Sequence, residues 1–303
     1  MVRRIRINFK CEVKMNRTVI DLQYEIKDSC IIIKKYIGNG RRVSIPEQFD
    51  GIPVIQIDKF AFAEHRQLKE VQLPATVKRL GAHAFYNCRS LKKVCFGDQL
   101  TDIGDGAFKN CYELNTLQLN GNQKKMRGMK YILSEFDSEI EVVLKENRLL
   151  FPSYVFDYQE NTMARTIHQD ILGAGFSYRN TVFADGIDYH EYDSLFYKVE
   201  ADSIQQSVRL AWYRLCTPYQ LSQKAKEIYE TFIMEHITEM IDYLLNQEDW
   251  EGIRKLMDWE LIRQTDLPNI LELAQKKQKI QAVSMLMEYQ SRFGMAEEKL
   301  FEL

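Results

Sequence analysis

The phrase LGAHAFYNC at residues 80–88 is repeated as IGDGAFKNC at residues 103–111. The two phrases begin at positions 80 and 103, and the same spacing lines up seven columns of apolar residues over three successive units. The columns are Val54, Val77 and Leu100; Ile57, Leu80 and Ile103; Ala61, Ala84 and Ala107; Phe62, Phe85 and Phe108; Leu68, Leu91 and Leu114; Val71, Val94 and Leu117; and Leu73, Phe96 and Leu119. A fixed period of this length, 23 in every column, indicates a chain built from stacked structural repeats.

Each unit predicts one short strand and one turn of helix. From Val71 or Val94 onward, apolar and polar residues alternate, as they do in a strand with one buried face. Around the alanine–phenylalanine pair, apolar residues lie three or four positions apart, which is the spacing of a helical turn. Asp58, Gly81 and Gly104 precede that turn, and both residue types serve as helix N-caps. Because one unit is too small to bury its own apolar face, the units are expected to stack into a solenoid.

The consensus of these units, I-G-x-x-A-F-x-N-C-x-x-L-x-x-V-x-L-P, resembles the bacterial BspA-type leucine-rich repeat. Residues 31–62 are also similar to the opening segment of that family, and the resemblance covers about residues 30–120. The first unit departs from the pattern, because His65 stands in the cysteine column. The resemblance implies a non-enzymatic binding or adhesion protein, of a kind often displayed on cell surfaces, that recruits partners on the concave face of its strands.

The strand alternation separates an inward row of residues from an outward row. The inward residues are expected to be Val43 and Ile45, Val71 and Leu73, Val94 and Phe96, and Leu117 and Leu119. On the resemblance, the outward residues of the same strands form the candidate partner-binding face, and they are Arg42, Ser44, Glu70, Gln72, Lys93, Cys95, Thr116 and Gln118. An ordinary solvated sheet face is the alternative for the same residues.

The period also places Cys88 and Cys111 in equivalent positions on adjacent coils, with His65 next in the column. A disulfide, a metal site and packed thiols are all compatible with such a column. The six cysteines of the chain include no C-x-x-C pair, so they form neither a disulfide framework nor a zinc spacing. Since the resemblance places a small, buried apolar side chain in this column, we expect packed free thiols.

The sequence predicts an α+β repeat protein in three parts. These are a leucine-rich repeat domain with N-terminal cap strands over residues 1–122, an aromatic-rich connecting region over 123–202, and an all-α domain over 203–303. In the last part a set of apolar residues recurs with a spacing of 30: Trp250, Ile253, Leu256, Met257 and Trp259 return as Ile280, Val283, Leu286, Met287 and Tyr289. The second copy is similar to the helical portion of an ankyrin repeat, which implies helix pairs that cap the solenoid or bind a partner. Thr217 and Pro218 predict the start of a helix, as its cap and its first residue.

Composition and motifs narrow the function. The sequence contains no nucleophile elbow, zinc-protease motif or phosphate-binding loop, so we expect no enzyme activity, no cofactor and no metal. Residues 1–125 carry 22 lysines and arginines against 13 acidic residues, and the remainder carries 19 against 30. A nucleic-acid-associated factor that uses the basic half is therefore an alternative, but it is not favoured, because the bases alternate with acids and no nucleic-acid motif accompanies them.

The N-terminal sequence and the apolar runs predict the location of the protein. No apolar run reaches the roughly 18 residues of a membrane span, and the N-terminus lacks the apolar core of a secretory signal. We expect a cytoplasmic protein without a membrane span, and a surface adhesin whose export signal is absent from this sequence is the alternative. The predicted function is a non-enzymatic protein–protein interaction module that binds unidentified protein partners through its repeat surfaces.

Overall fold

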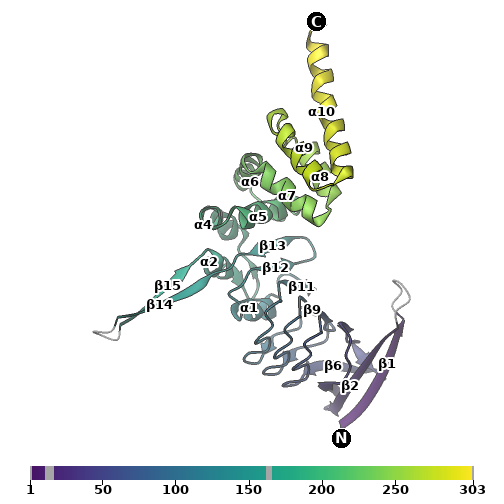
Figure 1. The fold of residues 1–303 in the computed structure, drawn as a ribbon. Coiled ribbons are helices and arrows are strands. Elements are labelled where there is room, and N and C mark those ends of the chain that lie inside the picture. Colours follow the sequence, from purple (N-terminus) through teal and green to yellow (C-terminus); the bar gives the residue numbers. More distant parts are fainter. Residues whose placement is uncertain (1, 11–16, 162–165, 302–303) are drawn as a thin grey trace. The chain divides into compact units, whose positions relative to one another are not determined.

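The computed structural model describes residues 2–10, 17–161 and 166–301. The chain divides into two compact units, residues 1–195 and 196–303 (Figure 1). The first unit contains a β-solenoid of about five turns, and the second unit is helical. This architecture confirms the predicted fold class, a leucine-rich-repeat solenoid followed by an all-α region. The domain boundaries predicted at residues 122 and 202 stay predictions.

Two sheets build the solenoid. One sheet has the strand order β13-β12-β11-β9-β7-β4. Its strands are β4 (Arg42–Ser44), β7 (Glu70–Gln72), β9 (Lys93–Gly97), β11 (Thr116–Asn120), β12 (Ile140–Val143) and β13 (Arg148–Phe151). The other sheet has the order β1-β2-β3-β6-β8-β10, with β5 paired to β6. Its strands are β1 (Val2–Lys10), β2 (Arg17–Lys27), β3 (Cys30–Tyr36), β5 (Gln48–Phe49), β6 (Ile52–Ile57), β8 (Arg79–Leu80) and β10 (Asp102–Ile103).

Strand direction distinguishes the coils from the N-terminal strands. Successive coils pair in parallel, as β4, β7, β9 and β11 do in one sheet and β6, β8 and β10 do in the other. By contrast, β1, β2 and β3 pair antiparallel. All eight residues predicted to face inward from the strands are buried, which confirms the alternation predicted from the sequence.

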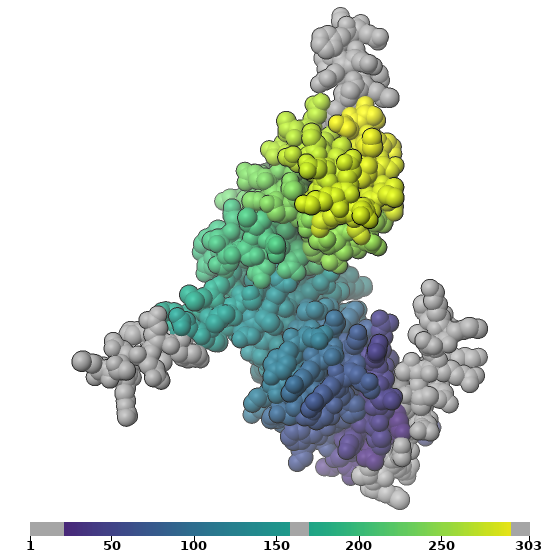
Figure 2. All heavy atoms as spheres, in the orientation of Figure 1, coloured from purple at the N-terminus to yellow at the C-terminus, as the bar shows by residue number. Residues whose placement is uncertain are grey.

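Aromatic side chains stack through the centre of the coils. Tyr36, Phe62, Phe85 and Phe108 form a column with ring centroids 5.1, 5.0 and 5.1 Å apart. Each of these side chains is at most 1% exposed. One repeat of 23 residues therefore advances the solenoid by about 5 Å, which is close to the distance between neighbouring strands of a sheet. In the space-filling view the coils pack into one continuous body, coloured blue to teal (Figure 2).

The helical segment expected in each coil is a series of tight turns. In the second coil the amide of Ala84 donates to the carbonyl of Gly81 at 3.2 Å, three residues back. His83 and Asn87 have φ angles of 57° and 58°. A residue in the left-handed conformation interrupts a right-handed helix. The chain therefore forms one turn at His83 and another at Asn87 before it enters the next strand. Gly81 has a further role, because a Cβ atom there would overlap the backbone amide of Lys59 in the preceding coil.

Backbone amides of these turns donate to carbonyls in the next coil. The amide of Phe85, for example, donates to the carbonyl of Ala107 at 2.8 Å. In the last of these coils the amide of Phe108 has a different acceptor, the carboxylate of Glu135, at 3.2 Å. Glu135 therefore takes the place of a carbonyl from a further coil.

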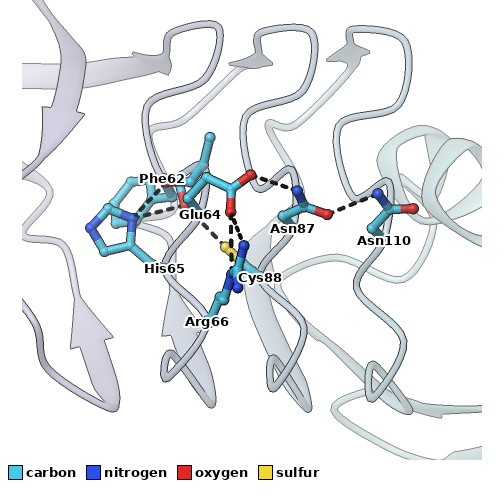
Figure 3. A network of polar contacts seen from close by, with 8 residues as sticks. Phe62, Glu64, His65, Arg66, Asn87, Cys88 and Asn110 are labelled. Atoms are coloured by element: carbon cyan, nitrogen blue, oxygen red, sulfur yellow. Dashed lines mark hydrogen bonds and ion pairs between the residues drawn. The ribbon is translucent and has the colours of Figure 1, made fainter.

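A ladder of side chains joins the same turns (Figure 3). Asn110 Nδ2 donates to Asn87 Oδ1 at 2.8 Å, and Asn87 Nδ2 donates to Glu64 Oε1 at 2.5 Å. The hydrogen bond from Asn87 is the main cause that holds the pKa of Glu64 below its usual range. The hydrogen bond and the positive charge of Arg66 act in the same direction. All three ladder residues have left-handed φ angles, between 58° and 66°. Asparagine is enriched in this conformation, which explains its place in the repeated phrase.

Cys88 and Cys111 are buried free thiols, which confirms the predicted packed thiols. The thiol of Cys88 donates to the carbonyl of Phe62 at 3.0 Å, and Cys111 makes the equivalent bond to its preceding coil at 3.2 Å. Burial raises the pKa of Cys88 to about 12 and also raises that of Cys111. His65 of the same column places Nδ1 3.0 Å from the Phe62 carbonyl (Figure 3). Cys11 lies outside the described residues.

The solenoid continues past residue 122. Helix α1 (Arg127–Ser134) precedes β12, which joins β11 in parallel, and β13 pairs antiparallel with β12. The rest of the first unit consists of β14 (Val155–Asn161), β15 (Thr166–Leu172), α2 (Gly175–Arg179), β16 (Val182–Phe183), β17 (Gly186–Ile187) and α3 (Tyr189–Ser194).

A buried arginine ties this part of the first unit together. The Arg179 guanidinium donates to the backbone carbonyls of Leu133, Ser138, Pro152 and Gly175, at 3.2, 2.6, 2.6 and 3.0 Å. Its side chain is almost completely enclosed, and burial lowers its pKa to about 10. One side chain therefore connects the end of α1, the loop before β12, the residue after β13, and α2.

The second unit consists of paired helices. They are α4 (Phe196–Asp202), α5 (Ile204–Cys216), α6 (Gln223–Glu235), α7 (Ile237–Gln247), α8 (Trp250–Asp258), the 3-10 helix η1 (Gln264–Asp266), α9 (Leu267–Lys276) and α10 (Ile280–Phe301). The spacing of 30 predicted from the sequence recurs here, since it separates the first residue of α8 from that of α10 and the first residue of α7 from that of α9. Within this unit α7 packs against α8 and α9, and α9 packs against α10. The likeness to ankyrin repeats stays a prediction.

The helix start predicted at Thr217 and Pro218 is wrong. Helix α6 begins at Gln223, and Ser222 is its N-cap. Thr217 instead follows the last residue of α5, and its hydroxyl donates to the carbonyl of Tyr213 at 2.7 Å.

Candidate functional site

The candidate site is the outward surface of the sheet that contains β4, β7, β9, β11 and β12, which we call the strand face. Strand register places the eight predicted residues in two rows. The first row is Arg42, Glu70, Lys93 and Thr116. The second row, two residues further along each strand, is Ser44, Gln72, Cys95 and Gln118. The structure therefore brings all eight residues together, and their role in binding a partner stays a prediction.

The pleat of the strands explains why these residues share one face. Between the two rows lie Val43, Val71, Val94 and Leu117, each at most 2% exposed. Successive side chains of a strand point to opposite sides of a sheet, so burying these four directs their neighbours outward.

The eight side chains differ in exposure. Three are exposed: Arg42, Ser44 and Gln72. Four are half-buried: Glu70, Lys93, Thr116 and Gln118. Cys95 is only 5% exposed, so it offers almost no surface to a partner, and burial raises the pKa of its thiol. It lies against the side chain of Gln118, with Sγ 3.7 Å from Oε1.

Several of these side chains contact one another across the strands. Arg42 Nε lies 3.4 Å from Glu70 Oε2, and Ser44 Oγ donates to Gln72 Oε1 at 3.3 Å. Lys93 forms no ion pair within the part of the chain that the structure describes. The strand face thus carries paired charges at β4 and β7 and, on β9, the half-buried ammonium group of Lys93.

The structure adds two residues that the sequence did not predict. Glu141 of β12 pairs in register with Thr116 and extends the first row to a fifth strand. Arg148 of β13 binds the Glu141 carboxylate with two hydrogen bonds of 2.7 and 2.6 Å. The sequence offered little signal, because IEVVL at residues 140–144 has one polar residue among apolar ones and shows no clear alternation. Glu141 was also missed because Val142, which pairs with Leu117, stands later in the chain than the period of the earlier coils predicts.

The strand face offers hydrogen-bond donors, acceptors and charges of both signs, which is chemistry suited to recognition. Across residues 2–10, 17–161 and 166–301, no group of three or more His, Cys, Asp or Glu side chains is placed to hold a metal ion. Over the same described residues, none of the helices has the length and apolar character that crossing a membrane requires.

Comparisons with solved structures find proteins that are similar to part of this chain. Two of them are leucine-rich repeat proteins and one is a leucine rich cell surface protein. The protein from T. pallidum is 27% identical, with 32% of this chain and 68% of that chain covered and a TM-score of 0.25. The protein from Bacteroides capillosus is 23% identical, with 41% and 94% covered and a TM-score of 0.32. A leucine rich cell surface protein from Faecalibacterium prausnitzii is 25% identical, with 46% and 43% covered and a TM-score of 0.28.

No curated protein matches the chain. Residues 41–171 match the family model described as BspA type Leucine rich repeat region, in six copies. The match runs past residue 120, where the resemblance seen in the sequence ends, and includes β12 and β13. Residues 41–171, which include the solenoid coils up to β13 as well as β14 and most of β15, are therefore similar to the BspA type of leucine-rich repeat.

Proposed function

We propose that this protein is a non-enzymatic protein-binding module and that its strand face takes the partner. Leucine-rich repeat proteins are generally protein-interaction modules, which supports the general part of the proposal. The observation that carries the specific part is the first row of the strand face. It presents one polar side chain from each of five neighbouring strands: Arg42, Glu70, Lys93, Thr116 and Glu141.

The dimensions of the face favour a small contact. Five parallel strands about 4.8 Å apart span about 19 Å from the first to the last. Specific protein interfaces usually bury about 800 Å² on each partner, which is more than two rows of side chains of this length supply. The strand face therefore suits a loop or a short segment of a partner protein, with any further contact made elsewhere.

The charge pattern favours protein over nucleic acid. Arg42 lies beside Glu70, and Arg148 is held by Glu141. Phosphate backbones are bound by clusters of uncompensated Lys and Arg, whereas these arginines already have carboxylate partners. Alternating charges of both signs suit a polar protein surface of complementary pattern.

Affinity capture with two matched variants tests the proposal. One variant carries Glu70→Ala, Lys93→Ala and Gln118→Ala on the strand face. The control carries Glu47→Ala, Lys78→Ala and Gln99→Ala, which are exposed residues of the same types outside the strands of that sheet. We expect the control to retain the proteins captured by the wild-type chain and the strand-face variant to lose them. Equal capture by all three chains would exclude the strand face, and capture of nucleic acid alone would exclude a protein partner.

Two finer features belong to the same proposal. The free thiols of Cys88 and Cys111 support a cytoplasmic setting, because exported proteins tend to join their cysteines in disulfides. The helix pairs of the second unit support a second, ankyrin-like surface that binds a partner, because stacked helix pairs expose such surfaces.

A further inference from the structure

A series of backbone hydrogen bonds between the solenoid turns ends at the last coil. The amide of Glu64 donates to the carbonyl of Tyr86 at 2.8 Å, and the amide of Asn87 donates to the carbonyl of Lys109 at 3.0 Å. Asn110 holds the equivalent position in the next coil, and its amide has no acceptor among the described residues. A backbone amide of this kind can donate a hydrogen bond to a carbonyl of another chain.

A pocket of about 410 Å³ lies at this end of the turns, between residues 106–112 and residues 135–138. Three aromatic residues contribute to its lining: Phe108, Tyr112 and Phe136. Phe108 is buried, whereas the Tyr112 side chain is 72% exposed. The charged residues of the lining are two carboxylates, Glu135 and Asp137, and one basic residue, Lys109. Apolar walls with an excess of negative charge favour a ligand that combines an apolar stem with a cation.

Glu135 supplies one of the two carboxylates of this pocket. Its carboxylate accepts the amide of Phe108 at 3.2 Å, and it forms no ion pair with a basic side chain in the described part of the chain. Glu135 is exposed as a residue, but its carboxylate is partly enclosed where it accepts the hydrogen bond from Phe108, and this local loss of hydration raises its pKa. A cation placed beside it would offset that loss.

We propose that this pocket binds a lysine or arginine side chain of a peptide segment from a partner protein. The cationic end lies between Glu135 and Asp137, and the aliphatic stem packs against Tyr112 and Phe136. A backbone carbonyl of the same peptide accepts the amide of Asn110. The pocket uses no residue of the strand face, so this inference does not rest on the proposed function.

Two short peptides test the pocket on the full-length chain. The probes are acetyl-Ala-Arg-Ala-amide and acetyl-Ala-Glu-Ala-amide, titrated into ¹⁵N-labelled protein and followed by amide chemical shifts. We expect the arginine peptide to shift the amide signal of Asn110 in a saturable way, because that amide gains an acceptor. We expect the glutamate peptide to cause no saturable shift, because its charge repels the two carboxylates of the pocket.

Variants then locate the cation. Glu135→Gln combined with Asp137→Asn keeps an oxygen acceptor for the amide of Phe108 while removing both charges, and it should weaken the arginine peptide about fivefold or more. The control is Glu113→Gln, which changes an exposed glutamate outside the pocket and should leave the affinity unchanged.

Four outcomes would overturn the inference. They are absence of saturable binding, equal binding of the glutamate peptide, saturable shifts that leave the Asn110 amide unchanged, and unchanged affinity of the folded double variant. The comparison of the two peptides uses the wild-type chain, so it tests the proposed pocket even if the double variant does not fold.

Discussion

The amide of Phe108 donates to the carboxylate of Glu135 at 3.2 Å, where the amide of Phe85, one coil earlier, donates to the carbonyl of Ala107 at 2.8 Å. The series of backbone hydrogen bonds between the coils therefore ends at a side-chain acceptor. The acceptor comes from the residue that follows α1, so the solenoid turns and the helix are joined at this point.

Removing this acceptor should destabilise the last coil where the amide of Phe108 is bound. Glu135→Ala leaves the amide of Phe108 without an acceptor, at a cost of about 1–3 kcal/mol. Glu135→Gln keeps an oxygen there and is the matched control. Hydrogen exchange of the Phe108 amide should become about tenfold faster in the alanine variant and change little in the glutamine variant. Equal exchange in both variants would mean that Glu135 is not the acceptor in solution.

The same carboxylate should make stability depend on pH. Burial raises the pKa of Glu135 in the folded chain above its value in the unfolded chain. A raised pKa means that its stabilising contribution is complete at low pH and is lost as pH rises through the raised value. The unfolding free energy of the wild-type chain minus that of Glu135→Gln should therefore fall as the pH rises above about 4. Urea unfolding followed by circular dichroism measures this difference, and a difference that rises with pH would contradict the assignment.

The repeat made most of the solenoid predictable from the sequence. Stacked coils repeat the same contacts, so Phe62, Phe85 and Phe108 must recur at one spacing to stack at about 5 Å. The same spacing placed the strand face, because strand register follows from the coil length. What the period cannot predict is which outward residue stays exposed, and Cys95 is buried against Gln118 although its position is outward.

The sequence failed where the period changes or where local signals compete. Residues 127–134 form helix α1, so the next strand arrives later than the period predicts and its polar residue Glu141 was overlooked. Thr217 and Ser222 both carry a side chain that can cap a helix, and only Ser222 does so. A capping residue is recognised from its immediate sequence, whereas the contacts of the folded chain decide at which of two such residues a helix begins.

Thiol labelling should report the burial of the cysteine column. In the native chain Cys88 and Cys111 should resist alkylation, because both are buried and burial raises the pKa of each thiol. Both should react once the chain is unfolded in urea without a reductant. Mass spectrometry of non-reduced samples counts the alkyl groups, and failure of both residues to react after unfolding would indicate a disulfide between them.

Arg179 should matter more to stability than an exposed arginine. Arg179→Met removes hydrogen bonds to four backbone carbonyls and should destabilise the first unit by about 3 kcal/mol or more. The control Arg148→Met removes a half-exposed ion pair with Glu141 and should cost about 1 kcal/mol or less.

Hydrogen exchange is the suitable readout for this pair of variants. All three tryptophans of the chain lie in the second unit, so tryptophan fluorescence would not follow the first. We expect faster exchange over residues 133–154 in the Arg179 variant alone. Equal exchange in both variants would mean that the buried guanidinium adds nothing beyond a surface ion pair.

The central claim is that the strand face contacts a protein partner, and site-specific photo-crosslinking in the native cell tests it most directly. A photoreactive residue replaces Gln72, which is exposed on the strand face, and in a matched chain it replaces Gln99, which is exposed outside that sheet. We predict a discrete crosslinked protein from position 72, and its loss when Glu70→Ala and Lys93→Ala are added. A crosslink to the same protein from position 99 alone, or a crosslink from position 72 that survives both substitutions, would contradict the account.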